Sequence, residues 1–154
     1  MSIGTNIEMG KAWAGNVQLG EAYVGDRLVY KAQSDPVTLR CTVQQDANIK
    51  RWGYYDYQIT EDWDTMTIID SRWGKSYGEF ETAIQLIDGG TTKTLVNRSG
   101  GYGGYPMAEE PIVAGGTQYA VKKGQTIRLL VGASYNPNLS GSFETTSWVS
   151  FVLT

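Results

Sequence analysis

The chain has 154 residues, of which 41% are hydrophobic and 19% charged, with one Cys and no His. Without histidine, Ser-His-Asp and Cys-His nucleophile activation and all His-containing zinc sites are excluded, and one cysteine cannot form an intrachain disulfide. The net charge is -3, and the sequence shows no stripe of basic residues that could bind nucleic acid. No apolar run has membrane-spanning length. We therefore expect no cofactor, no metal site, no nucleic-acid partner and no membrane insertion.

The composition favours strands over helices. Val, Ile and Thr together outnumber Leu and Ala, and β-branched side chains pack well on a pleated sheet but lose rotamer freedom in a helix. The 19 glycines indicate many turns. Residues 1–6 lack the basic and apolar regions of a signal peptide, so we expect synthesis in a cytoplasm without export. An all-β chain is the first expectation.

The first segment of the chain, residues 1–34, contains a repeat. Residues 9–16 align with residues 19–26, and both follow the pattern apolar-Gly-charged-Ala-aromatic-small-Gly-Asn/Asp. The Gly-Asn and Gly-Asp pairs that end the two copies are dipeptides of tight hairpin turns. Residues 22–24 and 27–30, on either side of the second pair, are predicted to form two short strands.

Two short hairpins bury too little surface to be stable alone. We therefore expect residues 1–34 to form an arm that docks on its own domain, on copies of itself in an oligomer or on a larger assembly, and residues 35–154 to form the main domain. In the alternative interpretation, the arm adds edge strands to the main sheet. The residues expected to make the arm's assembly contacts are apolar and aromatic: Trp13, Val17, Leu19, Tyr23, Val24, Leu28, Val29 and Tyr30.

The main domain is a succession of segments with strand periodicity. In the first, Val37, Leu39, Cys41 and Val43 alternate with polar residues, as in a strand with one buried face. Residues 80–87 fit a strand or one to two helical turns, and end at Asp-Gly-Gly. The strands expected in chain order are 37–44, 54–60, 65–70, 80–87, 92–97, 111–114, 117–121, 125–131 and 147–154.

Short strands with turns every few residues are typical of a β-sandwich or jelly roll. Residues 122–129, Lys-Lys-Gly-Gln-Thr-Ile-Arg-Leu, and residues 147–153, Ser-Trp-Val-Ser-Phe-Val-Leu, resemble the last strands of C1q/TNF-type jelly rolls. The predicted fold is thus an antiparallel jelly-roll-like β-sandwich that follows an arm of short β-hairpin repeats. The resemblance implies trimers around an axis.

A second resemblance involves the arm. Residues 20–31, Gly-Glu-Ala-Tyr-Val-Gly-Asp-Arg-Leu-Val-Tyr-Lys, are similar to a hairpin of tailed-phage virion proteins with the form aromatic-x-Gly-Asp-x-Leu-Val-Tyr. Such hairpins accompany fibre and receptor-binding domains. The resemblance implies a virion protein, made in the host cytoplasm, whose partners are its own copies and other virion proteins.

Aromatic residues crowd into residues 52–77 together with several acids, and two further tyrosines lie in a glycine-rich loop at 99–106. Exposed rings of this kind suit a glycan or a protein partner, whereas buried ones fill the core. The candidate contact residues are Trp52, Tyr55, Tyr57, Trp63, Trp73, Tyr102 and Tyr105.

Acidic groups offer weaker signals. Residues 61–64, Glu-Asp-Trp-Asp, have the hard oxygen ligands of a Ca²⁺ site but no EF-hand spacing, so a solvated turn is the simpler interpretation. Glu79 and Glu81 share one side of a strand and could serve as a glycosidase pair. Cys41 lies on the apolar face of its strand, where a buried, inert thiol is expected.

Three functions remain open from the sequence. The first is a non-enzymatic structural component of a phage particle, either a head fibre, a capsid decoration protein or a tail fibre involved in host attachment. The second is a carbohydrate-binding module that uses the exposed Trp and Tyr residues on a host-surface glycan. The third is a small carboxylate-dependent hydrolase.

Overall fold

The computed structural model describes residues 5–8, 11–14, 17–19, 21–24, 27–46, 49–74, 78–100, 109–134 and 143–154. Every regular element in these ranges is a β-strand, and none of the ranges contains a helix that could cross a membrane.

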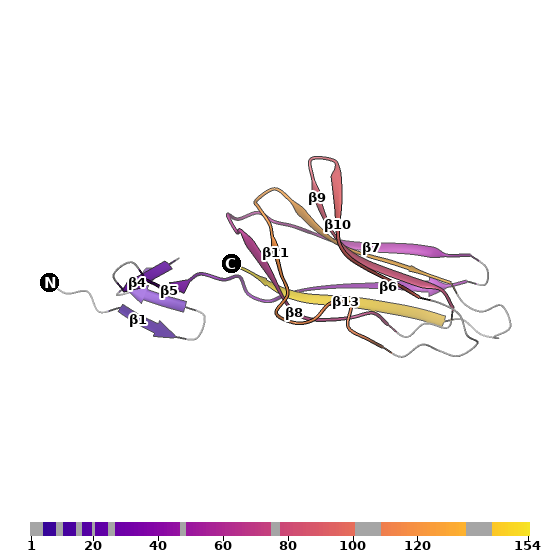
Figure 1. The fold of residues 1–154 in the computed structure, drawn as a ribbon, viewed down its shortest axis with the longest axis horizontal. Helices are drawn as coiled ribbons and strands as arrows, with labels where there is room; N and C mark the ends of the chain where they lie inside the picture. The colour runs from indigo at the N-terminus through magenta and orange to yellow at the C-terminus, as the bar shows by residue number, and fades with distance from the viewer. Residues whose placement is uncertain are drawn as a thin grey trace.

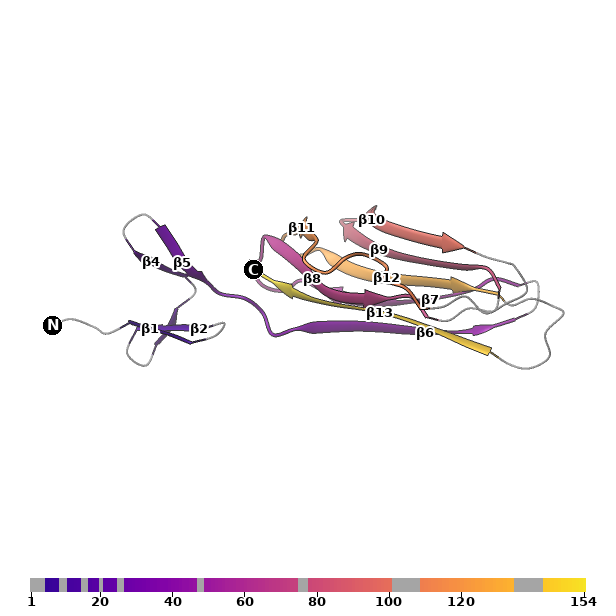
Figure 2. The same ribbon diagram turned by 60° about the horizontal axis from the view of Figure 1, so that its bottom comes forward.

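The main domain is a sandwich of two antiparallel four-stranded sheets (Figure 1). One sheet has the strand order β11-β8-β13-β6 and the other the order β10-β9-β12-β7. Figure 2 shows the two layers, with β6, β8 and β13 below β9, β10 and β12. The strands are β6 (Val37–Gln45), β7 (Arg51–Gln58), β8 (Thr65–Arg72), β9 (Phe80–Asp88), β10 (Thr91–Gly100), β11 (Gln118–Ala120), β12 (Thr126–Ala133) and β13 (Phe143–Leu153).

This strand order is that of a jelly roll. Successive strands from β6 to β13 alternate between the two sheets except at the β9–β10 hairpin, and the last strand lies beside the first in one sheet. The next-to-last strand, β12, lies beside the second, β7, in the other sheet. Two interlocked Greek keys of eight strands have this arrangement. The predicted all-β jelly-roll-like sandwich is confirmed by the strand pairings.

The core lies between the two sheets and is built by the expected alternation. On β6 the buried apolar residues are Leu39, Cys41 and Val43, as predicted, and the residues between them are exposed. The central strands β12 and β13 contribute a fully buried row each: Ile127, Leu129, Val131, Val149, Phe151 and Leu153 are all 0% exposed. Since strand side chains alternate between faces, each sheet places every second residue in this core.

Most expected strands are present, with different ends. The strand expected at 54–60 begins earlier, at Arg51, and the last strand begins at Phe143 instead of residue 147. In β13 the extension comes from pairing, because Phe143 to Phe151 are all in register with β6. Residues 80–87 form strand β9, not helical turns, and the turn that follows uses Gly89 and Gly90 with φ of 54° and 90°.

The prediction of a strand at 111–114 is wrong. Only Glu110 bridges to Trp73 there, and Ile112 and Val113 form a bend. Pro111 has no backbone N–H to give to a ladder. The Ser71 hydroxyl replaces a strand partner, because it accepts a hydrogen bond from the Val113 N–H at 3.0 Å and donates one to the Val113 carbonyl oxygen at 2.9 Å.

The arm forms two small sheets. One has the order β1-β2-β3 and the other consists of β4 and β5, so the predicted strands 22–24 and 27–30 are confirmed as β4 and β5. The predicted turn dipeptides at 15–16 and 25–26 lie outside the described residues. The arm strands are β1 (Thr5–Glu8), β2 (Lys11–Ala14), β3 (Val17–Leu19), β4 (Glu21–Val24) and β5 (Arg27–Lys31).

The described pairings join the arm strands only to one another, so the arm does not supply edge strands to the main sheets as the alternative expected. The connection runs past the end of the last strand. The Ser34 N–H donates to the Leu153 carbonyl oxygen at 2.8 Å, and the Leu153 N–H donates to the Ser34 hydroxyl at 2.9 Å. Figures 1 and 2 both show β4 and β5 beyond this end of the sandwich.

Candidate functional site

Strand β7 turns alternate aromatic side chains to the outside of the sandwich. Its odd-numbered residues face the other sheet, since Tyr57 makes an edge-to-face contact with Phe151 at 5.8 Å between ring centroids. A Cβ atom on Gly53 would lie 3.0 Å from the Cys41 sulfur on β6. The even-numbered Trp52 and Tyr54 therefore project outward, where they are 51% and 60% exposed.

Tyr54 carries a fixed cation on its ring. The Arg128 guanidinium carbon, from β12, lies 4.1 Å from the Tyr54 ring centroid. Both Arg128 Nε and Nη2 donate to the Asp56 carboxylate at 2.7 Å, a bidentate geometry. The bond to Asp56 also raises the pKa of Arg128 above its ordinary value. Asp56 and Arg128 are opposite each other in the β7–β12 register, so the sheet itself positions this stack.

Trp52 lies across a glycine on the neighbouring strand. Gly132 is opposite Trp52 in the register, and a Cβ atom there would be 2.7 Å from the Trp52 ring. The missing side chain is what allows the ring to lie on the sheet. The Lys50 ammonium lies 4.8 Å from the Trp52 ring centroid.

Lys50 is held in turn by an acid. Its ammonium donates to Glu81 Oε2 at 3.0 Å, and Asn97 Nδ2 donates to Glu81 Oε1 at 3.1 Å. The hydrogen bond from Lys50 is the main reason why the pKa of Glu81 is lowered, since it favours the ionised carboxylate. Glu81 therefore stays charged at neutral pH.

We call this set of side chains the outer aromatic surface; its members are Lys50, Trp52, Tyr54, Asp56, Glu81 and Arg128. It combines exposed aromatic rings with cations that are fixed by carboxylates. Trp, Tyr and Arg are the residues enriched at the energetic centres of protein interfaces. The arrangement can bind a partner by apolar contact and hydrogen bonds.

The predicted contact residues do not all lie on this surface. Trp52 is exposed on it, and Tyr55 is 53% exposed at the edge of the sheet, where β7 has a neighbour on one side only among the described strands. Tyr57 and Trp63 are half-buried and pack against the core. Tyr102 and Tyr105 lie outside the described residues.

The prediction of Trp73 as a contact residue is wrong. Trp73 is only 3% exposed and stacks on Phe80, with ring centroids 3.9 Å apart and an interplanar angle of 9°. It fills the core because the chain folds the end of β8 against the beginning of β9, and it cannot act as a surface contact. Four members of the outer aromatic surface were not among the candidate residues: Lys50, Tyr54, Asp56 and Arg128. Alternation with Trp52 could have indicated Tyr54, whereas Arg128 depends on the register between β7 and β12.

The carboxylates give little support to hydrolysis. A glycosidase acid needs a raised pKa, whereas the pKa of Glu81 is lowered by its partner Lys50. In the acidic turn at 61–64, Asp62 lies 3.4 Å from the Lys123 ammonium. Within the described residues, no three acidic or Cys side chains gather in a group that could hold a metal ion.

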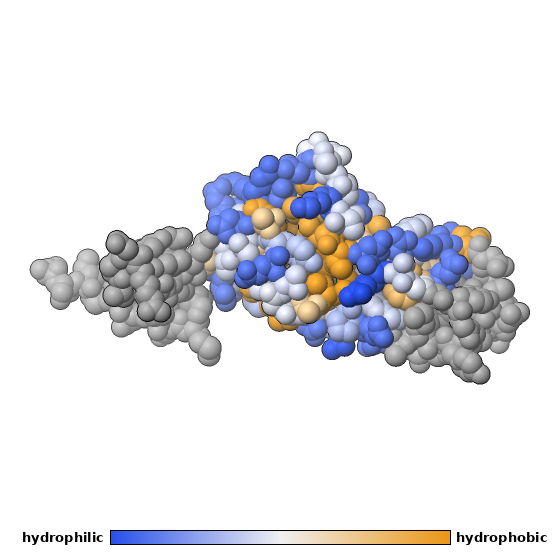
Figure 3. All heavy atoms as spheres, in the orientation of Figure 1, coloured by the Kyte–Doolittle hydropathy of each residue, from blue (hydrophilic) through white to orange (hydrophobic). Residues whose placement is uncertain are grey.

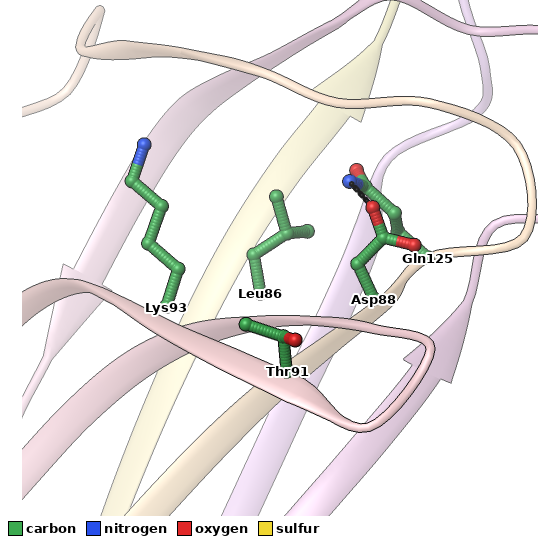
Figure 4. A pocket seen from close by; sticks show the side chains of 5 residues that line it. All are labelled: Leu86, Asp88, Thr91, Lys93 and Gln125. Atoms are coloured by element: carbon green, nitrogen blue, oxygen red, sulfur yellow. Dashed lines mark hydrogen bonds between the residues drawn. The ribbon is translucent and has the colours of Figure 1, made fainter.

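A small pocket of about 320 Å³ opens beside the β9–β10 hairpin (Figure 4). Leu86 lies between Lys93 on one side and Asp88 with Gln125 on the other. Asp88 is already engaged, since it accepts hydrogen bonds from Gln125 at 3.1 Å and lies 2.8 Å from the Lys122 ammonium. The bond from Lys122 is the main cause of the lowered pKa of Asp88.

The edge of the sandwich near β10 and β11 carries apolar surface. Figure 3 shows an apolar strip between polar regions on the face drawn there. Leu95 and Val96 from β10, and Val113 and Tyr119 from the other side, are half-buried and pack against the core. Burial raises the pKa of Tyr119. This strip is continuous with the core of the sandwich.

Cys41 is buried between the sheets, as predicted, with an exposed fraction of 7%. Desolvation raises the pKa of its thiol, which disfavours the reactive thiolate.

The predicted arm contacts are placed by their strands. The structure describes the backbone pairing of these residues, so their role as contacts stays a prediction. Trp13 lies in β2, Val17 and Leu19 in β3, Tyr23 and Val24 in β4, and Leu28, Val29 and Tyr30 in β5.

No protein-family model matches the sequence, and no curated protein matches it. Among solved structures, it is similar to the VP2 subviral particle of infectious bursal disease virus, with a TM-score of 0.38 and 13% identity over 89% of this chain. The Gt strain of the same virus gives a TM-score of 0.36 and 12% identity over 88% of this chain. The chain spans 38% of the length of each of these proteins. At such low TM-scores the likeness carries no argument, so the jelly roll rests on the strand order of this chain itself.

Proposed function

We propose that this chain is a non-enzymatic structural component of a phage particle that acts by assembly and surface contact, as a head fibre, a capsid decoration protein or a tail fibre. In this proposal residues 1–34 are the docking arm and residues 35–154 the outward-facing jelly roll. The protein is made in the host cytoplasm and functions in the virion, in contact with other virion proteins.

One observation carries the proposal: the described arm strands form sheets of three and two strands that pair with no strand of the sandwich. An isolated two-stranded sheet is marginal in water unless another surface covers it. A partner is therefore needed to stabilise the arm. The resemblance of residues 20–31 to virion hairpins supports a phage particle as the source of that partner.

The resemblance of the last two strands to C1q/TNF-type domains supports a trimer. Light scattering on the full-length protein tests it, and the expected mass is that of three chains of 17.0 kDa each. Quantification of the chain in purified particles tests the virion role. A monomer at all concentrations that is also absent from particles contradicts the proposal.

A second function, binding of a host-surface glycan, is favoured by the exposure of Trp52 and Tyr54 on the outward face of β7. A glycan array is the direct test, with Trp52→Ala and Tyr54→Ala, on the same outward face of β7, as variants that should lose any signal. Lys123→Met, at an exposed contact remote in sequence from these rings, is the control that should keep it. An array without signal, or a signal unchanged in both variants, removes this function.

A further inference from the structure

The repeat in the arm is longer than the pair of eight-residue segments. Residues 6–10 read Asn-Ile-Glu-Met-Gly and residues 16–20 read Asn-Val-Gln-Leu-Gly, so the repeating unit begins at Asn6 and again at Asn16. The first unit contains most of β1 and all of β2, and the second contains β3 and β4. The strands β1 and β3 are therefore equivalent, and so are β2 and β4.

The two equivalent units are paired differently. In the first unit, β1 pairs with β2, and Ile7 is opposite Ala12. The equivalent positions in the second unit are Val17 and Ala22, but Val17 is opposite Ala14 of β2 and Ala22 is opposite Tyr30 of β5. Each of β3 and β4 thus has one edge without a strand neighbour among the described strands.

The local chain length explains why β3 and β4 of one chain are not paired. Strand β3 continues to Leu19 and β4 begins at Glu21, so a single residue separates them. The commonest short hairpin loops have two residues, as between Glu8 and Lys11 in the first unit. With β3 extended to Leu19, the chain cannot turn back on itself, and the two edges remain available.

We infer that the open edge of β3 in one copy of this chain pairs with the open edge of β4 in a second copy, in the antiparallel register that β1 and β2 use. The repeat identifies the occupant as another copy. The equivalents of β3 and β4 in the first unit are β1 and β2, and these two strands already pair with each other. The inference rests on the proposed function of the arm in assembly and specifies how that assembly is held.

Such pairing removes the weakness of the small sheets. The three-stranded sheet of one arm and the two-stranded sheet of the next become one continuous sheet, which is large enough to be stable. The open edges of β3 and β4, which otherwise invite aggregation, are covered. Because β3 and β4 are different surfaces, the contact is head-to-tail, and the proposed trimer is the ring that three such contacts close.

Disulfide trapping tests the inference in the full-length chain. The variant carries Val17→Cys and Ala22→Cys, and the matched control carries Ile7→Cys and Ala12→Cys at the equivalent positions of the first unit. Residues directly opposite in antiparallel strands have the Cα separation that a disulfide requires. Both are made with Cys41→Ala and also with Cys41 retained, since that native thiol is buried.

After mild oxidation, a non-reducing gel should show the control as an internally crosslinked monomer and the variant as covalent multimers up to the trimer. A reductant should return these multimers to monomers. A crosslink within one chain in the variant, identified by its peptide mass, overturns the inference, and so does the absence of any crosslink. Light scattering before oxidation separates the two proposals. An oligomer without an interchain crosslink refutes the β3–β4 contact alone, and a monomer refutes the assembly role as well.

Discussion

The Arg128 guanidinium lies 4.1 Å from the centroid of the Tyr54 ring, although the two residues come from different strands. Strand β12 is central in its sheet and β7 is at the edge, so this stack and the bond of Arg128 to Asp56 fasten the edge strand to its neighbour. The outer aromatic surface is consequently held in place before any partner arrives, which reduces the entropy that binding must overcome.

Replacement of Arg128 by Lys should lower the free energy of unfolding by about 1 kcal/mol, because lysine keeps the charge but loses the planar fork on Asp56 and the stacking on Tyr54. Urea denaturation near neutral pH is the measurement. The control Lys123→Met removes a more exposed ion pair with Asp62 and should change the stability by less than about 0.5 kcal/mol. Equal effects of the two variants contradict this role of Arg128.

Substitution of Trp52 and of Trp73, both predicted contact residues, should affect stability to different degrees. Trp73→Ala empties a site in the core beside Phe80 and should cost about 3–5 kcal/mol, whereas Trp52→Ala removes an exposed ring and should cost about 1 kcal/mol or less. Denaturant midpoints of both variants give the comparison. If Trp52→Ala is the more destabilising, the assignment of core and surface is wrong.

Two glycines should differ in their tolerance of a methyl group. In Gly74→Ala the new Cβ would lie 2.1 Å from the Thr146 backbone oxygen, which belongs to strand β13 and cannot move aside alone. We expect a loss of about 3 kcal/mol or failure to fold. In Gly132→Ala the new Cβ meets the Trp52 ring, an exposed side chain that can swing away, so the loss should be smaller and tryptophan fluorescence should change. Thermal unfolding and emission spectra measure both effects. Equal stabilities of the two variants would contradict the expected difference between the two glycines.

The pair of Glu81 with Lys50 predicts a pH dependence. Because the folded-state pKa of Glu81 is lowered from 4.5, chiefly by the hydrogen bond from Lys50, its ionised form stabilises the folded state. This contribution is present above pH 4.5 and is lost as the pH falls through the lower folded-state pKa. Wild type should therefore be more stable than Glu81→Gln near neutral pH, and the difference should vanish in strong acid. Urea titrations at several pH values measure it, with Glu61→Gln in the exposed acidic turn as the control. A difference that does not depend on pH rules out ionisation of Glu81 as its cause.

The thiol of Cys41 should react slowly with a thiol reagent in the native protein and rapidly in denaturant. It is 7% exposed, and desolvation raises its pKa, so little thiolate forms. Because the chain has one cysteine, the absorbance of the released reagent reports this position alone. Fast reaction in the native protein would show that the two sheets separate readily at β6.

Local patterns account for the parts of the fold that were predicted. The alternation of Leu39, Cys41 and Val43 with polar residues determines the buried face of β6, because successive side chains of a strand point to opposite sides. The glycine pair after Asp88 likewise predicts the β9–β10 turn, because only a residue without a Cβ adopts positive φ at little cost. The segment at 111–114 was not predictable in this way, since its bend depends on the hydroxyl of Ser71.

The sequence by itself determined an all-β chain without histidine-dependent active sites, since it contains no His and a single Cys. Only the tertiary structure decided which aromatic residues are available for contact. Trp52 and Trp73 look alike in a sequence rich in Trp and Tyr, but one lies on a glycine of the outer face and the other against Phe80 in the core. Alternation is a property of a single strand, whereas the neighbours of a side chain depend on pairing between segments distant along the chain.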